Sequence, residues 1–383
     1  MSNAAPGIRR AMSSALEAEA VAEELHAALA QPDMRLVIVF CAADRDIAAL
    51  AGALKRRFAP VPVIGCTTAG EIGPLGYRRA SVVGISLAAP EFTAAPVLLR
   101  DLESFHIGTG QTAVRQAMQA VLASDPDAKR DRMFAFTLID GLSGCEEAVV
   151  SSLHAVLGEI QLFGGSAGDG LRFERTLVIH DGEVHPNCAL FVLVATELPF
   201  RVFKTEHFMA GREKMVVTEA DPARRIVTEI NAEPAAQEYA RMVGLKPTAL
   251  TPMVFANHPV VVRVGGNNFV RSIQKMNGDG SLTFFCAIDE GIVLTVAQGI
   301  DLAENLTELF TSLRQELGAP ALVLGFDCIL RGLEMDEKCI RDDVGRMMME
   351  NNVVGFSTYG EQYQAMHVNQ TFTGVAIGAR RRT

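Results

Sequence analysis

A nine-residue segment occurs twice in this chain, and this repeat restricts the fold more than any other feature of the sequence. Val63–Glu71 reads VIGCTTAGE and Val353–Glu361 reads VVGFSTYGE, so five of the nine positions are identical. A shorter version, Leu162–Asp169, keeps the order of apolar pair, glycine, hydroxyl, glycine and acid. A motif that returns at intervals indicates a chain built from related structural units.

The residues around each motif repeat as well. An apolar strand precedes each motif, a helical segment follows that strand, and a further strand follows the motif. The first strands are expected at Leu36–Cys41, Met133–Ile139 and Ala321–Phe326, the helices at Asp46–Phe58, Cys145–Glu159 and Asp336–Glu350, and the last strands at Ser81–Leu87, Cys188–Ala195 and Phe372–Gly378. A crossover through a helix favours parallel pairing of the two strands it joins. The sequence therefore predicts an α/β fold of strand–helix–strand–strand units that form mixed sheets.

The segments outside these units have a different pattern. Helices are expected over 110–123 and 301–317, where apolar residues recur three to four positions apart. A block of strands is expected at Val260–Val264, Phe269–Lys275 and Ser281–Ile288, with a hairpin turn at Asn277–Gly280 and an edge strand within Lys204–Glu219. Prolines near 200–235 mark a domain seam.

Composition excludes several classes of protein. The 35 Lys and Arg against 45 Asp and Glu give a net charge of −10, which disfavours binding to a nucleic-acid backbone. No apolar run is long enough to cross a membrane. The seven cysteines show no CxxC spacing, which is typical of free thiols in a cytoplasmic protein and argues against a zinc ribbon or a c-type haem.

The glycine turns are the candidate ligand site. Glycine lets a ligand approach backbone N–H groups, while the hydroxyls and acids around it offer polar contacts. The candidate residues are Gly65, Thr67, Thr68, Gly70, Glu71, Ser357, Thr358 and Glu361. The alternative is that the turns are tight structural corners whose hydroxyls and acids bond neighbouring backbone, and the sequence leaves both open.

One enzyme motif is present and is disfavoured. Gly164–Gly168 reads GGSAG, which matches the nucleophile elbow of hydrolases around Ser166. That elbow requires a helix directly after the serine, whereas Arg175–His180 alternates like a strand. We therefore expect a protein that is not an enzyme.

The repeated turns resemble the FIST family of sensory modules from bacterial signalling proteins. The residues that carry the resemblance are Gly65–Glu71, Val270–Ile273, Gly355–Glu361 and Asn369–Thr371. It implies a lead-in over 1–33, a FIST N-terminal domain over 34–230 and a FIST C-terminal domain over 231–383. Within the family the chain is similar to the NosP-type haem proteins that sense nitric oxide.

The resemblance implies an intracellular sensor that binds haem b and nitric oxide and regulates a partner histidine kinase or cyclic-di-GMP enzyme. It leaves open whether the chain forms a homo-oligomer. A haem-free sensor for an amino acid or another small polar metabolite, bound at the glycine turns, is the alternative.

Two histidines are the candidate haem-iron ligands. His258 precedes Pro259, which restricts the backbone of His258 to an extended form, and apolar residues surround it in the sequence. His367 follows the third glycine turn and is the second choice. A neutral imidazole is the expected donor because no low-pKa thiolate is indicated.

Overall fold

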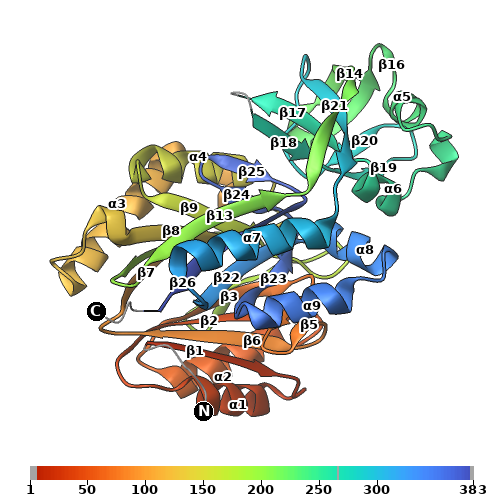
Figure 1. Cartoon of the computed structure of the whole chain (residues 1–383). Helices are drawn as coiled ribbons and strands as arrows, with labels where there is room; N and C mark the ends of the chain where they lie inside the picture. The colour runs from red at the N-terminus through yellow and green to blue at the C-terminus, as the bar shows by residue number, and fades with distance from the viewer. Residues whose placement is uncertain (1–6, 265–266, 380–383) are drawn as a thin grey trace.

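The computed structural model describes residues 7–264 and 267–379, and its main body consists of three copies of one unit (Figure 1). Each unit runs strand, helix, strand, helix, strand, hairpin, strand. The first contains β1 (Ile8–Ser13), α1 (Ala18–Leu29), β2 (Met34–Ala42), α2 (Ile47–Phe58), β3 (Val63–Thr68) and β6 (Val82–Ala88). The second contains β7 (Phe92–Leu99), α3 (Ile107–Ser124), β8 (Met133–Ile139), α4 (Glu146–Leu157), β9 (Gln161–Ser166) and β12 (Ala189–Thr196). The third contains β13 (Phe200–Glu206), α7 (Leu302–Leu317), β22 (Pro320–Cys328), α8 (Ile329–Glu337), α9 (Arg341–Glu350), β23 (Val353–Thr358) and β26 (Thr371–Gly378).

The strand order is the same in each unit. The sheets run β1-β6-β2-β3, β7-β12-β8-β9 and β13-β26-β22-β23, with the last two strands of each parallel and the other pairs antiparallel. The expected α/β class with mixed sheets is confirmed. The segment before residue 34, expected to be a lead-in, supplies β1 and α1 of the first unit.

The hairpin that follows each glycine turn leaves its own unit and completes the sheet of another. β4 (Glu71–Gly73) and β5 (Gly76–Arg78) extend the third sheet beside β23, and β10 (Val178–His180) and β11 (Glu183–His185) extend the first beside β3. β24 (Glu361–Tyr363) and β25 (Met366–Val368) extend the second beside β9. This cyclic exchange ties the three units together through backbone hydrogen bonds.

One apolar core lies between the inner faces of the three sheets. Its centre is aromatic: the rings of Phe40 and Phe356 lie 4.7 Å apart, and those of Phe163 and Phe326 lie 5.5 Å apart. Helices cover the outer faces and form smaller cores with them. Because each of the three sheets contributes to the central core, no unit can bury its apolar surface alone.

The first glycine of the repeated motif lies where two parallel strands approach closely. A Cβ on Gly65 would lie 1.9 Å from the carbonyl oxygen of Val39, and one on Gly355 would lie 1.6 Å from that of Gly325. No other residue fits at either position without displacing backbone. The repeat in the sequence thus reflects a repeated packing requirement.

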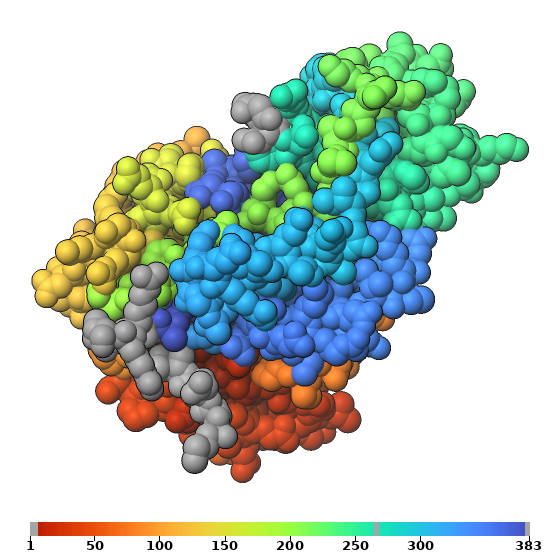
Figure 2. All heavy atoms as spheres, viewed as in Figure 1, coloured from red at the N-terminus to blue at the C-terminus, as the bar shows by residue number. Residues whose placement is uncertain are grey.

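A separate lobe, residues 208–299, is inserted between β13 and α7 of the third unit and projects from the body (Figure 2). Its sheet contains β14 (Phe208–Asp221), β15 (Ile226–Ile230), β16 (Glu233–Pro234), β17 (Val260–Val264), β18 (Asn267–Arg271), β19 (Ile273–Met276), β20 (Leu282–Phe284) and β21 (Val293–Gly299). α5 (Ala235–Met242) and α6 (Pro252–Asn257) pack on this sheet around a core of their own. The expected boundary between the two FIST domains, at 230/231, falls at the end of β15, inside this lobe. The division of the sequence at that boundary stays a prediction.

Some local expectations were wrong. The helix expected over Asp336–Glu350 is two helices, because Cys339 adopts a left-handed φ of 55° that interrupts it. The strand expected over Ser281–Ile288 shortens to Leu282–Phe284, whereas the turn at Asn277–Gly280 is confirmed. The cysteines are free, as expected. Among the described helices, none is long and apolar enough to span a membrane.

Candidate functional site

The three glycine turns meet in a ring. The N–H of Ala69 donates to the carbonyl of Ser357 at 2.9 Å, and the N–H of Ser357 donates to the carbonyl of Gly70 at 2.7 Å. These bonds join the first and third turns, which confirms that the two nine-residue motifs are adjacent.

The second turn closes the ring on both sides. The Ser166 N–H donates to the carbonyl of Gly360 at 2.8 Å, and the Gly168 N–H donates to the carbonyl of Thr67 at 3.0 Å. The hydroxyl of Thr67 also accepts a bond from the N–H of Leu177 at 3.0 Å. Each turn therefore contacts both others, at the end of the body where the parallel strands β3, β9 and β23 finish.

The acids of the first and third turns are buried and bonded inside the protein. Ser81 donates to Glu71 from its N–H and its hydroxyl, and Thr68 donates from its hydroxyl. Burial raises the pKa of Glu71 despite these bonds. Glu361 accepts from Thr358 and Thr371 in the same way, and burial raises its pKa to about 8. Both carboxyl groups hold the turns in shape, which is what the structural-corner interpretation expects of them.

The acid of the second turn also bonds backbone. Asp169 accepts hydrogen bonds from the N–H groups of Phe173, Glu174 and Arg175 and from the hydroxyl of Tyr359. Burial alone would raise the pKa of Asp169, but these bonds outweigh it and lower the pKa. The Asp169 carboxylate is therefore charged and already occupied.

A pocket of about 330 Å³ opens beside this ring. Of the eight candidate ligand residues, it contains Thr68, Gly70, Glu71 and Ser357 in its lining. The other four belong to the ring without lining the pocket: Gly65, Thr67, Thr358 and Glu361. That these eight residues bind a ligand stays a prediction. The pocket is the space that such a ligand would occupy.

Four arginines also line the pocket, and no pattern in the sequence indicated them. They are Arg78, Arg79, Arg172 and Arg341. Arg172 follows the second turn, whereas Arg78 and Arg79 end the exchanged hairpin β4–β5. They were missed because the hairpin exchange brings residues of different units to one place, and no local pattern encodes that exchange.

Tyr77 connects the pocket to a buried network of charged groups. Tyr77 lines the pocket, and its hydroxyl donates to Asp327 at 2.5 Å. Arg331 donates from Nε to the other oxygen of Asp327 at 2.6 Å and from Nη1 to Nδ1 of His207 at 2.8 Å. Arg331, Asp327 and His207 are all fully buried.

His207 lies in the connection between the body and the lobe. It separates β13 from β14, and its carbonyl accepts from the N–H of Ile300 in the returning connection at 2.7 Å. Its Nε2 lies 2.6 Å from Glu334. Burial lowers the pKa of His207, so the neutral ring accepts from Arg331 at Nδ1 and donates to Glu334 from Nε2. A continuous chain of polar contacts thus runs from the pocket to the base of the lobe.

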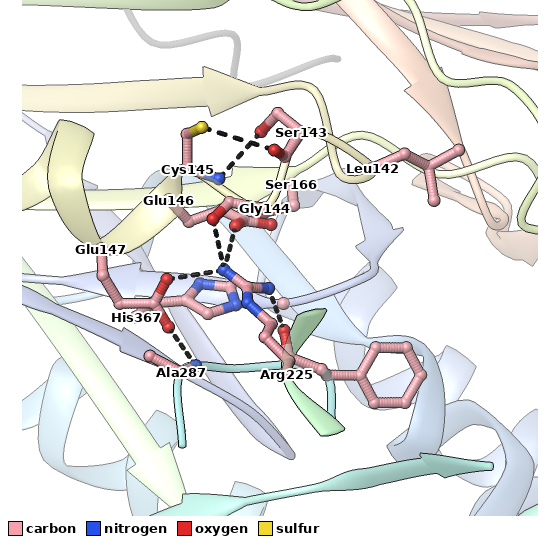
Figure 3. Close-up of polar contacts among 12 residues, drawn as sticks. Leu142, Ser143, Gly144, Cys145, Glu146, Glu147, Ser166, Arg225, Ala287 and His367 are labelled. Carbon is pink, nitrogen blue, oxygen red and sulfur yellow. Dashed lines mark hydrogen bonds and ion pairs between the residues drawn. The ribbon is translucent and has the colours of Figure 1, made fainter. Parts of the chain in front are cut away.

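A second polar cluster joins the lobe to the start of α4 (Figure 3). Arg225 of the lobe donates from Nη2 to Glu146 and Glu147 at 2.7 Å each. Burial would lower the pKa of Arg225, but the two carboxylates outweigh it and raise the pKa. Glu147 also accepts from the N–H of Ala287 in the lobe at 2.6 Å.

His367 lies beside this cluster and is buried (Figure 3). Its Nδ1 lies 3.2 Å from Nε2 of Gln362, which also donates to the hydroxyl of Ser166 at 2.9 Å. The amide nitrogen of Gln362 is a donor, so Nδ1 of His367 accepts, and the other ring nitrogen of His367 is Nε2. Within the described part of the chain, Nε2 has no hydrogen-bond partner.

The two candidate haem-iron ligands lie in different surroundings. Gly360 lies against the imidazole of His367: a Cβ there would be 2.3 Å from Cε1 and 2.7 Å from Nε2. A side chain at position 360 would therefore collide with the imidazole, and glycine leaves room for the ring. His258 ends α6, half-buried, and its carbonyl accepts from the hydroxyl of Tyr239. Neither histidine lines the pocket beside the ring, and their assignment as iron ligands stays a prediction.

Residues 7–264 and 267–379 contain no cluster of three or more His, Cys, Asp or Glu side chains that could hold a metal ion.

Comparison with known families identifies the class of protein that this fold belongs to. The FIST N domain family matches residues 35–233, and the FIST C domain family matches residues 235–364. The chain therefore belongs to the FIST family, as the glycine-turn motifs indicated. FIST domains give the protein a sensory role in signal transduction.

Individual relatives are distant. The uncharacterized protein MJ1623 of Methanocaldococcus jannaschii is 22% identical over 349 residues, which span 82% of this chain and 67% of that protein. A crystal structure of cyanuric acid hydrolase from A. caulinodans covers 98% of this chain and 99% of its own, with a TM-score of 0.42 and 9% identity. Another cyanuric acid hydrolase structure gives a TM-score of 0.38 and 8% identity over 97% of this chain and 99% of its own.

Proposed function

We propose that this FIST protein senses an amino acid or similar small polar metabolite in the pocket beside the ring of glycine turns. The observation that carries the proposal is the position of the pocket. Its lining combines Thr68 and Gly70 of the first unit, Asp169 of the second and Ser357 of the third. A ligand bound there would contact all three units at once and would stabilise their arrangement.

The size of the pocket supports a small ligand. Its volume of about 330 Å³ is at the lower end of the range of about 300–1,000 Å³ that is usual for ligand pockets. The pocket lies at the carboxyl ends of parallel strands, where open α/β sheets commonly bind ligands.

We propose binding without catalysis. Ser166, the one residue in a hydrolase-like motif, is fully buried, and its hydroxyl accepts from the Gln362 amide. A serine nucleophile needs access to substrate and a base that accepts its proton. The contacts of Ser166 supply neither.

The proposed output is a change in the position of the lobe. Tyr77 connects the pocket to Asp327, Arg331 and His207, and His207 lies in the connection to the lobe. A ligand that moves Tyr77 would change the contacts that fix this connection. Coupling of this kind requires that the ligand bind the two arrangements with different affinity.

The proposed partner is a histidine kinase or a cyclic-di-GMP enzyme, and this rests on the resemblance to FIST sensors. The projecting lobe is the surface we expect to contact it (Figure 2). A measurement of kinase or cyclic-di-GMP activity with the full chain present, with and without the metabolite, tests the pairing. Size-exclusion chromatography with light scattering tests for a homo-oligomer.

Haem-based sensing of nitric oxide is the second candidate. The observation that favours it is the buried, unpartnered Nε2 of His367. An absorption spectrum of the purified protein with haemin tests this candidate: a Soret band that shifts with nitric oxide and disappears in His367→Ala would support it.

The experiment that tests the metabolite proposal is a thermal-shift screen with the protein amino acids and small organic acids. Ala43→Phe places a ring at a position that lines the pocket and should abolish the shift. Ala123→Phe changes an exposed alanine on α3 and is the control that should keep it. A screen without a shift in the parent protein would reject the proposal.

A further inference from the structure

We propose that the ligand of this pocket carries a carboxylate, held between the guanidinium groups of Arg78 and Arg172. This inference rests on the proposed function and names the chemical class of the ligand. The two arginines come from different units, Arg78 from β5 and Arg172 from the loop after the second turn, and both line the pocket.

Each of these two arginines is oriented by a backbone carbonyl and keeps donors free. Nη1 of Arg78 donates to the carbonyl of Tyr77 at 2.9 Å, and Nε of Arg172 donates to that of Asp169 at 3.0 Å. A guanidinium has five N–H donors, so both retain several for a ligand. The contact of Arg172 through Nε leaves its terminal nitrogens, the ones that most readily form a bidentate pair with a carboxylate.

Arg78 and Arg172 differ from the other two arginines of the pocket in having no ion-pair partner in the part of the chain that the structure describes. Arg79 and Arg341 both pair with Asp336, at 3.1 Å for Arg79. Within the described residues, no carboxylate lies within ion-pair distance of Arg78 or Arg172. Arg78 and Arg172 therefore keep donors that no carboxylate of the described residues engages in an ion pair.

The oxygens of Glu71 and Asp169 in the pocket lining are engaged by other donors and form no ion pair with these cations. Burial raises the pKa of Glu71, and its oxygens accept bonds from Thr68 and Ser81. The oxygens of Asp169 accept from backbone N–H groups and Tyr359. A ligand carboxylate would offer two acceptors in a planar geometry that matches the free donors of the guanidinium groups.

Asp44 lines the same pocket, and its position distinguishes two classes of ligand that carry a carboxylate, amino acids and simple organic acids. It is an exposed carboxylate for which the structure shows no ion pair within the described residues. An amino acid would place its ammonium group near Asp44 and its carboxylate between the arginines. A simple organic acid would use the arginines alone.

The test measures binding to the full chain by isothermal titration and thermal shift. The probes are the protein amino acids, succinate and citrate, with the amino-acid amides and succinamide as neutral counterparts. We expect the carboxylates to bind and the amides to bind at least about tenfold more weakly, because a charge-assisted hydrogen bond is lost.

The variants Arg78→Gln and Arg172→Gln should each weaken binding of the carboxylate probe by about ten- to a hundredfold. Both residues are exposed, so the folded protein should keep its melting temperature. Arg115→Gln, at an exposed position of α3 outside the pocket, is the control and should change the affinity by less than about threefold. Asp44→Asn should weaken binding of an amino acid and leave succinate unaffected.

The outcomes separate the two proposals. Equal binding of acids and amides, or unchanged affinity in both arginine variants, would overturn the carboxylate assignment while the pocket remains a metabolite site. If none of the probes binds the parent protein, both the carboxylate assignment and the proposed function are wrong.

Discussion

Glu71 and Glu361 make the same set of hydrogen bonds in two different units of the chain. Each accepts from the hydroxyl of the threonine three residues before it, and from the N–H and hydroxyl of the residue ten positions after it. The internal repeat is therefore preserved in side-chain contacts as well as in backbone. These two acids keep the turns closed, and the pocket depends on that closed ring.

The raised pKa of Glu361 predicts a pH dependence of stability. The folded protein holds this proton up to about pH 8, whereas the unfolded chain releases it near its ordinary value of 4.5. The stabilisation is therefore full below about pH 4.5 and is lost as the pH rises toward 8. Glu361→Gln keeps a neutral side chain, so its free energy of unfolding should fall less between pH 5 and pH 8, by at least about 1 kcal/mol.

Urea unfolding of both proteins at the two pH values measures this difference. Glu350→Gln, at an exposed position of α9, is the control and should follow the parent protein. If Glu361→Gln and the parent lose the same stability between pH 5 and pH 8, the side chain is ionised in the folded protein.

The close approach of parallel strands at the motif glycine predicts a large packing penalty. Gly355→Ala would place a Cβ 1.6 Å from the carbonyl oxygen of Gly325, and the backbone must shift to avoid it. We expect a loss of about 3 kcal/mol or more in the free energy of unfolding. Gly278→Ala, with no atom within 4 Å of the added Cβ, should change stability by less than about 0.5 kcal/mol. Similar melting temperatures for the two variants would contradict the described packing.

The buried pair of Arg331 and Asp327 predicts strong, non-additive effects. Arg331→Met leaves the carboxylate of Asp327 buried without its cation, which should cost about 3–5 kcal/mol. Adding Asp327→Asn removes that charge and should restore part of the loss. Denaturant unfolding of both single variants and the double variant gives the coupling energy, and strictly additive values would show that the two side chains do not act together.

The contact of Arg225 with α4 predicts how firmly the lobe is held. Arg225→Gln removes the cation between Glu146 and Glu147 and should speed amide hydrogen exchange in the lobe segment around Ala287. Arg241→Gln breaks an ion pair inside the lobe, with Glu238, and is the control that should leave this segment unchanged. Equal exchange in Arg225→Gln and the parent protein would mean that other contacts hold the lobe.

The sequence determined the repeated unit and its elements. Apolar runs and helical periodicity fixed β2, α2 and β3 and their counterparts, because these patterns report which faces are buried. The glycines at 65 and 355 were informative because close strand approach excludes every other side chain. A resemblance carried by several short motifs was then enough to indicate the FIST family.

The tertiary structure alone decided how the units assemble and what the pocket contains. The hairpin exchange that brings Arg78 of the first unit into one pocket with Arg172 of the second depends on backbone pairing between segments far apart in the chain. The same is true of His367, whose imidazole is enclosed by Gly360 and Gln362 after folding. Local patterns record burial and backbone conformation, whereas the contacts that define this site form between units, and only the packing of the three sheets around their common core specifies them.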